Sequence, residues 1–266
     1  MMCESRRLAL HYSKVAEAYD RHWAPVIQPM ARPLLGALPL AAARNVLDLG
    51  AGTGGLLSEL QRAAPQASVA GVDNAEGMLR IARRTWTGPL AVMDAMRLGL
   101  RSESVDVAVM VFMLFHLDLA GGLAEAHRVL RRGGTLGIAT WGEGSNLPGI
   151  EIWTEELDRM GAGPDPRPSG MERQRRMDTP DKLAALLEPA GFEVTRAWSE
   201  TATHRWVVPD LHAHHAHCSS AGRRLESLPP TVRSACRTRA EERIARLSEA
   251  ELCFQPLVVF ATARRA

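Results

Sequence analysis

Three acidic residues lie in or at the end of short apolar segments that are typical of β-strands. Asp48 lies within the first of these segments, Asp73 ends the second and Asp94 ends the third. In a doubly wound parallel sheet, ligands bind beyond the carboxyl ends of the strands, so these side chains are expected to meet there. A carboxylate at that edge can accept the hydroxyls of a ribose, recognise an adenine amino group or attract a cation. The three acids together predict a site for adenosine with a positively charged amino-acid tail.

Four glycines follow Asp48 in the run Val-Leu-Asp-Leu-Gly-Ala-Gly-Thr-Gly-Gly at residues 46–55. Such glycines let the backbone turn tightly and allow a ligand to lie against it, and the helix that follows offers unpaired amides. The pattern Gly50-x-Gly52-x-x-Gly55 also satisfies the dinucleotide fingerprint, with which Asp73 is compatible. A nicotinamide-dependent oxidoreductase is therefore a second hypothesis. Asp48 favours the site for adenosine with a positively charged tail, because a pyrophosphate gains nothing from a carboxylate at that position.

Apolar and β-branched runs that alternate with helical patterns predict an α/β protein. The expected architecture is a doubly wound, mostly parallel sheet of seven strands with a helical cap over the substrate. The last strand contains Pro256, which is best tolerated at an edge or a bulge. The seven strands are expected at 45–50, 68–73, 90–94, 105–111, 135–141, 192–198 and 253–263.

The chain is expected to divide into a core and segments that cover it. The predicted core comprises residues 45–141 with 179–199 and 252–266. Residues 1–44 are expected to form an N-terminal helical lid. Residues 142–178 and 200–251, which have helical or irregular patterns, are expected to be cap insertions over the substrate pocket. The substrate would therefore be enclosed by segments that are far apart in the sequence.

In order and spacing, the motifs resemble those of the class I S-adenosylmethionine-dependent methyltransferases, in particular the methyltransferase type 11 branch that acts on small molecules. The resemblance implies a Rossmann-like methyltransferase fold, S-adenosyl-L-methionine as cofactor and S-adenosyl-L-homocysteine as product. Departures from the family pattern are Ala75, Phe115 and Arg132, where the family often has Ser, His and Pro. The matching segments are Tyr12-x-x-x-Ala16-x-x-Tyr19-Asp20, the glycine run 48–54, and residues 73–79, 93–95, 114–117 and 128–134.

The resemblance also implies which residues contact the cofactor. Gly50 and Gly52 would approach the methionine moiety, and Tyr19 would close over the amino-acid tail. Asp73 would hold the ribose, and Asp94 would read the adenine with the backbone of its neighbour. Two alternatives stay open: Met78 as ordinary core and Asp48 as a turn cap. The remaining cofactor residues implied are Asp48, Thr53, Asn74, Met78, Ala95 and Val111.

Histidines are the candidates for acid–base chemistry. His116 follows the fourth predicted strand, and its ordinary pKa of about 6.5 suits a general base near neutrality. Its alternative role is to hydrogen-bond the loop and shape the pocket. His214 and His217, in the cluster at residues 212–217, are its rivals as base. No carboxylate or thiol completes a familiar metal-binding spacing in that cluster, so no metal is predicted.

Composition excludes several function classes. The 266 residues carry 32 basic and 30 acidic side chains, a formal charge of +2, which argues against nucleic acid as partner. The longest apolar run, Val107 to Phe115, falls short of the roughly 20 residues of a membrane helix. Four cysteines without a CxxC pair indicate free thiols, and we expect a cytoplasmic protein.

The leading hypothesis is a bacterial methyltransferase that modifies oxygen or carbon of a small, partly apolar molecule in secondary metabolism, with a homodimer as a possible assembly. The near-zero charge argues against RNA as acceptor. A non-catalytic or non-methylating protein that binds S-adenosylmethionine is the alternative that stays open beside the oxidoreductase.

Overall fold

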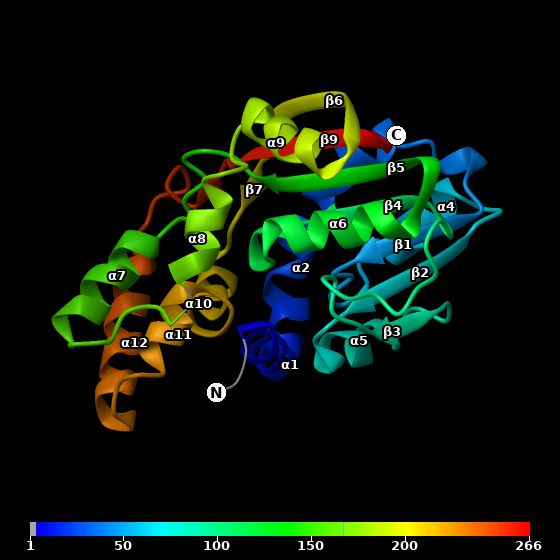
Figure 1. The fold of residues 1–266 in the computed structure, drawn as a ribbon. Coiled ribbons are helices and arrows are strands. Elements are labelled where there is room, and N and C mark those ends of the chain that lie inside the picture. The colour runs from blue at the N-terminus through cyan, green and yellow to red at the C-terminus, as the bar shows by residue number, and fades with distance from the viewer. Residues whose placement is uncertain (1–3, 167) are drawn as a thin grey trace.

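A seven-stranded sheet organises the protein (Figure 1). The computed structural model describes residues 4–166 and 168–266. The strand order is β3-β2-β1-β4-β5-β9-β6; the first five strands are parallel, and β9 runs antiparallel between β5 and β6. The predicted doubly wound, mostly parallel sheet is confirmed. The strands are β1 (Asn45–Leu49), β2 (Ser68–Asp73), β3 (Leu90–Val92), β4 (Val105–Val111), β5 (Leu130–Trp141), β6 (Phe192–Thr201) and β9 (Leu257–Arg265).

The prediction of one continuous strand over 253–263 is wrong. Cys253–Phe254 forms a separate strand, β8, which pairs with β7 (His204–Arg205) outside the main sheet. β9 begins only at Leu257. Pro256 lies between the two strands, where its missing N–H interrupts no ladder, and its carbonyl accepts a hydrogen bond from the amide of Ala202. This break frees β9 to occupy the interior of the sheet, where a proline within the strand would remove a ladder hydrogen bond.

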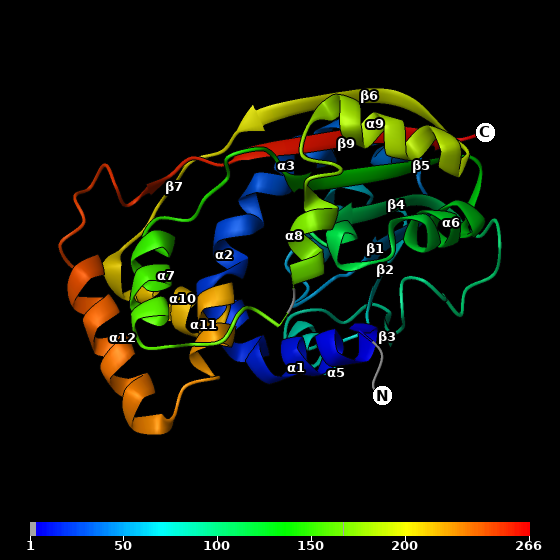
Figure 2. The same ribbon diagram turned by 60° about the vertical axis from the view of Figure 1, so that its left-hand side comes forward.

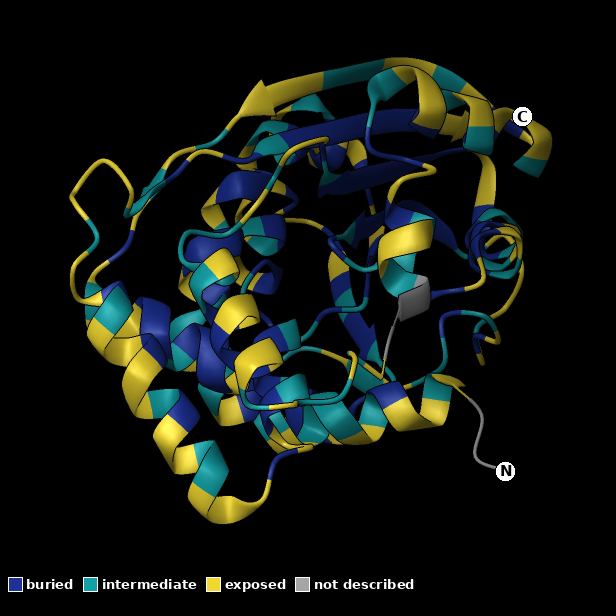
Figure 3. Cartoon of the chain, turned by 90° about the vertical axis from the view of Figure 1, so that its left-hand side faces the viewer, coloured by how far each residue is buried: buried dark blue, intermediate teal, exposed yellow. Residues whose placement is uncertain are grey.

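Helices cover both faces of the sheet because successive strand residues point to opposite sides. In β1, Val46 belongs to the core beneath α2, α3 and α4, whereas Leu47 belongs to the core beneath α6 and α9. Figure 3 shows β5 and β9 buried along most of their length. The covering elements are α2 (Ala24–Ile27), η1 (Pro29–Ala31), α3 (Arg32–Ala37), η2 (Leu40–Ala42), α4 (Leu57–Ala63), α6 (Leu119–Val129), α9 (Pro180–Leu187) and η4 (Glu188–Ala190).

Additional helices gather beyond the end of β5. Figures 1 and 2 both place α7, α10, α11 and α12 together on the side toward which β5 runs. Helix α1 packs against both α5 and α10, and so lies between this group and the part of the sheet that carries α5. The helices of this group and the remaining helices of the protein have these bounds: α1 (Glu4–His22), α5 (Glu76–Ala82), η3 (Leu114–His116), α7 (Ile150–Arg159), α8 (Pro168–Gln174), α10 (Val208–His217), α11 (Ser220–Leu225) and α12 (Pro230–Ile244).

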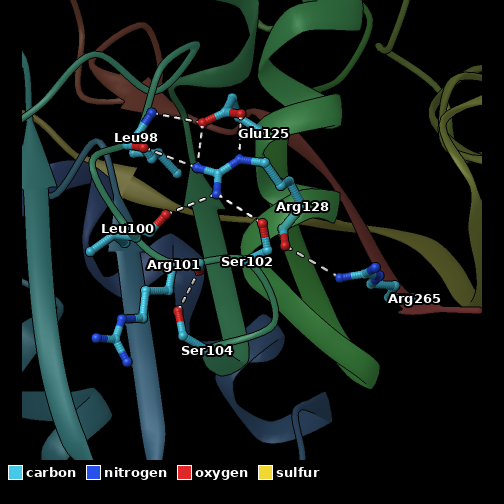
Figure 4. Close-up of polar contacts among 8 residues, drawn as sticks. All are labelled: Leu98, Leu100, Arg101, Ser102, Ser104, Glu125, Arg128 and Arg265. Carbon is cyan, nitrogen blue, oxygen red and sulfur yellow. Dashed lines mark hydrogen bonds and ion pairs between the residues drawn. The ribbon is translucent and has the colours of Figure 1, made fainter.

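Arg128, in the last turn of α6, fixes the connection between β3 and β4 (Figure 4). Its guanidinium donates to the carbonyl oxygens of Leu98 and Leu100 at 2.9 and 2.8 Å and to the carboxylate of Glu125 at 2.7 Å. Glu125 in turn accepts from the amide of Leu98 at 2.7 Å. Arg128, the first arginine of the 128–134 motif, therefore has a structural role.

Among the residues described, no helix has the length and hydropathy that crossing a membrane requires.

Candidate active site

A cleft opens at the carboxyl ends of β1, β2 and β4, under helix α1. The structure brings most of the predicted cofactor residues to it, from five separate parts of the chain. A side pocket, which holds Asp48 and Thr53, adjoins the cleft at Gly50 and Gly52. Asp94 is not among the residues that line either space. The predicted residues lining the cleft are Tyr19, Gly50, Gly52, Asp73, Asn74, Met78, Ala95, Val111 and His116.

The glycine turn after β1 forms the floor of the cleft. Gly50 and Gly52 have φ values of 73° and 56°, in the left-handed region that favours glycine. A Cβ added to Gly52 would meet no protein atom within 4 Å, so the space above this residue is open to a ligand. The amide of Gly52 donates to Asp73 Oδ2 at 2.9 Å. The turn is thus held against the end of β2 while its surface stays accessible.

Asp73 ends β2 and is fixed by two amides. Its Oδ2 accepts from Gly52, and its Oδ1 accepts from the amide of Ala75 at 2.8 Å. Burial raises the pKa of this carboxyl group, and the backbone hydrogen bonds oppose that rise. Each carboxylate oxygen retains a lone pair for a further donor. The geometry suits recognition of a diol such as that of ribose.

Asp48 is a buried carboxyl group in the side pocket. Only 2% of its surface is exposed, and burial raises its pKa to about 7, with the negative charge of Asp73 adding to the effect. In the same pocket the buried hydroxyl of Thr53 has no hydrogen-bond partner among the described residues. A cationic group would lower the pKa of Asp48 and so favour its ionised form, and its N–H groups could donate a hydrogen bond to the hydroxyl of Thr53. The residues present therefore fit an ammonium-bearing ligand.

Asp94 is engaged by helix α1. Its Oδ2 accepts from the hydroxyl of Ser5 at 2.8 Å, and its Oδ1 accepts from the amide of Met96 at 3.0 Å. The amide side chain of Asn74 donates to the same Ser5 oxygen at 3.3 Å. Ser5 therefore offers Asp94 the kind of donor that an adenine amino group would offer. No sequence pattern predicts a role for Ser5, because its place depends on how α1 packs over the sheet.

A second and larger cavity, the chamber, adjoins the cleft and has a volume of about 860 Å³. Residues of α1, α7, α8, α10 and α11 surround it, together with the ends of β4 and β5. His116 lines both spaces, and its Nε2 lies 3.0 Å from the hydroxyl oxygen of Tyr12. The residues common to both spaces are Leu8, Tyr12, Tyr19, Phe112 and His116.

Sequence reasoning placed Tyr12 in a lid motif without giving it a role, and it missed Phe112. The hydroxyl of Tyr12 contacts His116 directly. Tyr12 and Tyr19 are seven residues apart on one helix, a spacing that puts both on the same face. That spacing is the signal from which a shared role could have been read. No comparable signal exists for Phe112, whose position follows from an unusual backbone turn after β4.

The histidine cluster of α10 divides between the interior and the surface. His214 is buried and lines the chamber, whereas His217 is exposed and is not among the residues that line the cleft or the chamber. His215 is buried, and its Nε2 donates to the carbonyl oxygen of Pro148 at 2.7 Å. Burial lowers the pKa of His215 to about 4. Within residues 4–166 and 168–266, no group of three or more His, Cys, Asp or Glu residues is arranged to hold a metal ion.

Comparisons with known proteins match the part of the chain that contains the glycine turn of the cleft. Residues 47–138 match the model of a family described as a methyltransferase domain. The chain is 33% identical over 206 residues to a malonyl-[acyl-carrier protein] O-methyltransferase of Geobacter sulfurreducens. This match covers 75% of this chain and 74% of that protein. The chain is 28% identical over 204 residues to a demethylmenaquinone methyltransferase of Roseiflexus castenholzii. This match covers 68% of this chain and 83% of that protein.

The fold is also similar to that of solved structures. An N-methyltransferase of Haemonchus contortus, solved with phosphomonomethylethanolamine and S-adenosylhomocysteine, superposes with a TM-score of 0.56 at 17% identity. The match covers 100% of this chain and 60% of that one. At this identity the likeness establishes the fold alone. The names of the three proteins carry three different acceptors, so these relatives do not fix the acceptor of this chain.

Proposed function

Because the chain belongs to the class I S-adenosylmethionine-dependent methyltransferases, we propose that it binds S-adenosylmethionine in the cleft and methylates oxygen or carbon of a small, partly apolar acceptor in the chamber. The observation that carries the proposal is the junction of the two spaces. Five residues, Tyr12 and His116 among them, line both the cleft and the chamber. A donor on one side of this junction and an acceptor on the other are thereby brought together.

Residues of the cleft, of its side pocket and of the adjoining contact between Asp94 and Ser5 suit the parts of the cofactor. Asp48, with the hydroxyl of Thr53, would hold the ammonium-bearing tail, and Asp73 would hold the ribose hydroxyls. Asp94 would take the adenine amino group in place of Ser5. When bound, S-adenosylmethionine would supply a methyl group on its sulfonium: the acceptor would attack the methyl carbon in line, the carbon–sulfur bond would break, and S-adenosylhomocysteine would leave. Positioning of the acceptor is therefore the main task of the protein.

An acceptor hydroxyl must lose its proton as it is methylated, and His116 is placed to receive it. His116 lines the junction, and its ring contacts the hydroxyl of Tyr12. A proton leaving the acceptor would reach the imidazole directly or through the Tyr12 hydroxyl. A general base of this kind contributes about 10²–10⁴ in rate. His214 does not line the cleft, and burial holds its pKa well below the ordinary value, so we assign it no part in proton transfer.

The proposal is tested with purified protein, methyl-labelled S-adenosylmethionine and a panel of phenols, alcohols and carbon acids. We expect binding of S-adenosylhomocysteine but not of NADH, and labelled product from at least one acceptor. His116→Ala is expected to lower methyl transfer to a hydroxyl acceptor by at least about 100-fold and to leave S-adenosylhomocysteine affinity within about twofold. His217→Ala, at an exposed position, is the matched control and should leave both unchanged.

Three outcomes would contradict parts of this proposal. A loss of less than tenfold in His116→Ala, with cofactor still bound, removes the histidine as general base. Cofactor binding without transfer to any acceptor favours a non-methylating S-adenosylmethionine-binding protein. Binding of NADH in preference to S-adenosylhomocysteine contradicts the assignment of the cleft.

A further inference from the structure

A row of aromatic rings forms one wall of the chamber. The ring of Phe112 lies 4.2 Å from that of Trp141 with the planes 26° apart, and Trp141 lies 5.8 Å from Trp23. Trp23 in turn lies 4.3 Å from the ring of His214. All four residues line the chamber, and Phe112 also lines the cleft. The row thus leads from the junction with the cofactor cleft to helix α10.

The end of this row nearest the cleft is held under backbone strain. Phe112 has a φ of 52°, in the left-handed region that bulky side chains rarely adopt. Such a conformation is strained and persists only where its surroundings fix it. Here the amide of Phe112 donates to the carbonyl of Ala139 at 2.8 Å, and the buried ring stacks on Trp141. The turn therefore holds an apolar aromatic ring at the point where methyl transfer would take place.

The far end of the row carries unused hydrogen-bonding capacity. His214 is only 2% exposed, and neither of its ring nitrogens has a hydrogen-bond partner among the described residues. Burial lowers its pKa well below the ordinary value, with His215 and His22 adding to the effect, so the ring is neutral. A neutral imidazole has one donor and one acceptor, and a buried polar group left unpaired has a free-energy cost. An occupant of the chamber with an oxygen at this corner would recover that cost.

We propose that the acceptor is a planar aromatic molecule that lies against the rings of this row and carries a second oxygen substituent, which hydrogen-bonds His214. The inference rests on the proposed function, because the methylated atom must lie at the junction near Phe112. His214 would then determine specificity rather than take part in the reaction. The chamber, at about 860 Å³, lies toward the upper part of the range of about 300–1,000 Å³ for small-molecule sites. It has room for more than a single ring.

The test compares three probes by isothermal titration into protein saturated with S-adenosylhomocysteine: 2-naphthol, 2,7-dihydroxynaphthalene and the saturated decahydronaphthalene-2,7-diol. The wild type should bind the dihydroxy probe at least about tenfold more tightly than 2-naphthol, and the saturated diol at least about tenfold more weakly than its aromatic counterpart. In His214→Phe the preference for the second hydroxyl should fall to about one, with 2-naphthol affinity within about twofold. His217→Phe, on the same helix but exposed, should keep the full preference.

A second variant keeps the test decisive if His214→Phe fails to fold. Trp141→Leu should weaken both naphthols by a similar factor of about five or more, since it removes an aromatic contact without touching the hydrogen bond. An unchanged preference in His214→Phe, equal binding of the saturated diol, or no binding of the naphthols to the wild type would overturn the proposal. Failure of the proposed function is separate, because it would appear as loss of S-adenosylhomocysteine binding or of labelled methyl transfer.

Discussion

The cofactor cleft and the acceptor chamber are built in different ways. In the cleft, backbone groups fix the geometry: the amides of Gly50 and Ala51 donate to the carbonyl of Val72 at 2.8 and 3.0 Å, and the amide of Gly52 fixes Asp73. In the chamber, side chains of distant helices meet across ion pairs, such as Arg173 with Glu4. Backbone geometry constrains the residue types at a few positions, whereas side-chain contacts can be exchanged. The cleft can therefore keep one ligand while the chamber changes its acceptor.

The largest effect that tests this comparison is expected from the glycine turn. Gly52 and Gly133 both have positive φ values, 56° and 73°, and a Cβ at either would meet no protein atom within 4 Å. Alanine therefore introduces similar backbone strain at both positions. Gly52→Ala also places a methyl group in the space assigned to the cofactor, and we expect S-adenosylhomocysteine affinity to fall at least about 100-fold. Isothermal titration measures the loss.

Gly133→Ala is the matched control for that substitution. It should lower the free energy of unfolding by about as much as Gly52→Ala, by roughly 1–2 kcal/mol, and leave cofactor affinity within about twofold. Chemical unfolding separates the two contributions. Equal loss of affinity in both variants would mean that strain, and not occupation of the cleft, explains the effect.

A smaller effect is expected from the charge of Asp48. Its pKa of about 7 in the cofactor-free protein means that the group is mostly neutral at pH 6, and a cationic ligand binds the ionised form. S-adenosylhomocysteine affinity should therefore rise roughly tenfold between pH 5.5 and 7.5 and then level off. Asp48→Asn should remove this dependence and bind about tenfold more weakly at pH 8. Titrations across pH in buffers of different ionisation enthalpy would also detect the proton released on binding.

The stability of the cofactor-free protein should respond in the opposite sense. Because the folded pKa of Asp48 lies above its ordinary value of 3.8, the folded state keeps a proton that the unfolded state loses between about pH 4 and 7. This group therefore makes the free energy of unfolding fall as pH rises through that window. Asp48→Asn should raise the melting temperature at pH 8 by at least about 2 °C. A lower melting temperature would show that the buried charge is already compensated.

The sequence predicted the cleft better than the chamber for a physical reason. The glycine turn and Asp73 lie within about 25 residues and obey local rules of strand ends and backbone conformation. The contact between Ser5 and Asp94 joins residues 89 positions apart and depends on the packing of α1. The turn at Phe112 violates the local preference of its residue type. Neither feature has a periodic pattern from which it could be predicted.

The error at residues 253–263 has a similar origin. An apolar run of that length satisfies the pattern of one strand, and its proline suggested an edge position. The structure instead ends the strand pairing before Pro256 and starts it again at Leu257, so that β9 lies inside the sheet. Pairing partners on both sides decide this arrangement, and they come from β5 and β6, far from it in the chain.

The smallest effect on the cleft is expected from the ion cluster that joins helices α7 and α12. The buried carboxylate of Glu156 in α7 accepts hydrogen bonds from Arg239 and Arg243 of α12 at 2.9 and 2.8 Å. Burial works against its ionisation, but these hydrogen bonds prevail, and the pKa of Glu156 is lowered. Its stabilising contribution is therefore present above about pH 4.5 and is lost as pH falls through the lowered pKa. Glu156→Gln should cost about 1–3 kcal/mol of unfolding free energy at pH 7.

The same variant should leave S-adenosylhomocysteine affinity within about twofold while it raises the KM for the acceptor, because α7 lines the chamber and not the cleft. Lys14→Met is the control: it removes an exposed ion pair with Glu226 between α1 and α11, and such pairs contribute less than about 1 kcal/mol. Unfolding curves and cofactor titrations of both variants test the separation of the two regions. If Glu156→Gln weakens cofactor binding as strongly as Gly52→Ala, the cleft depends on the packing of α7 against α12, and the proposed independence of donor and acceptor sites is wrong.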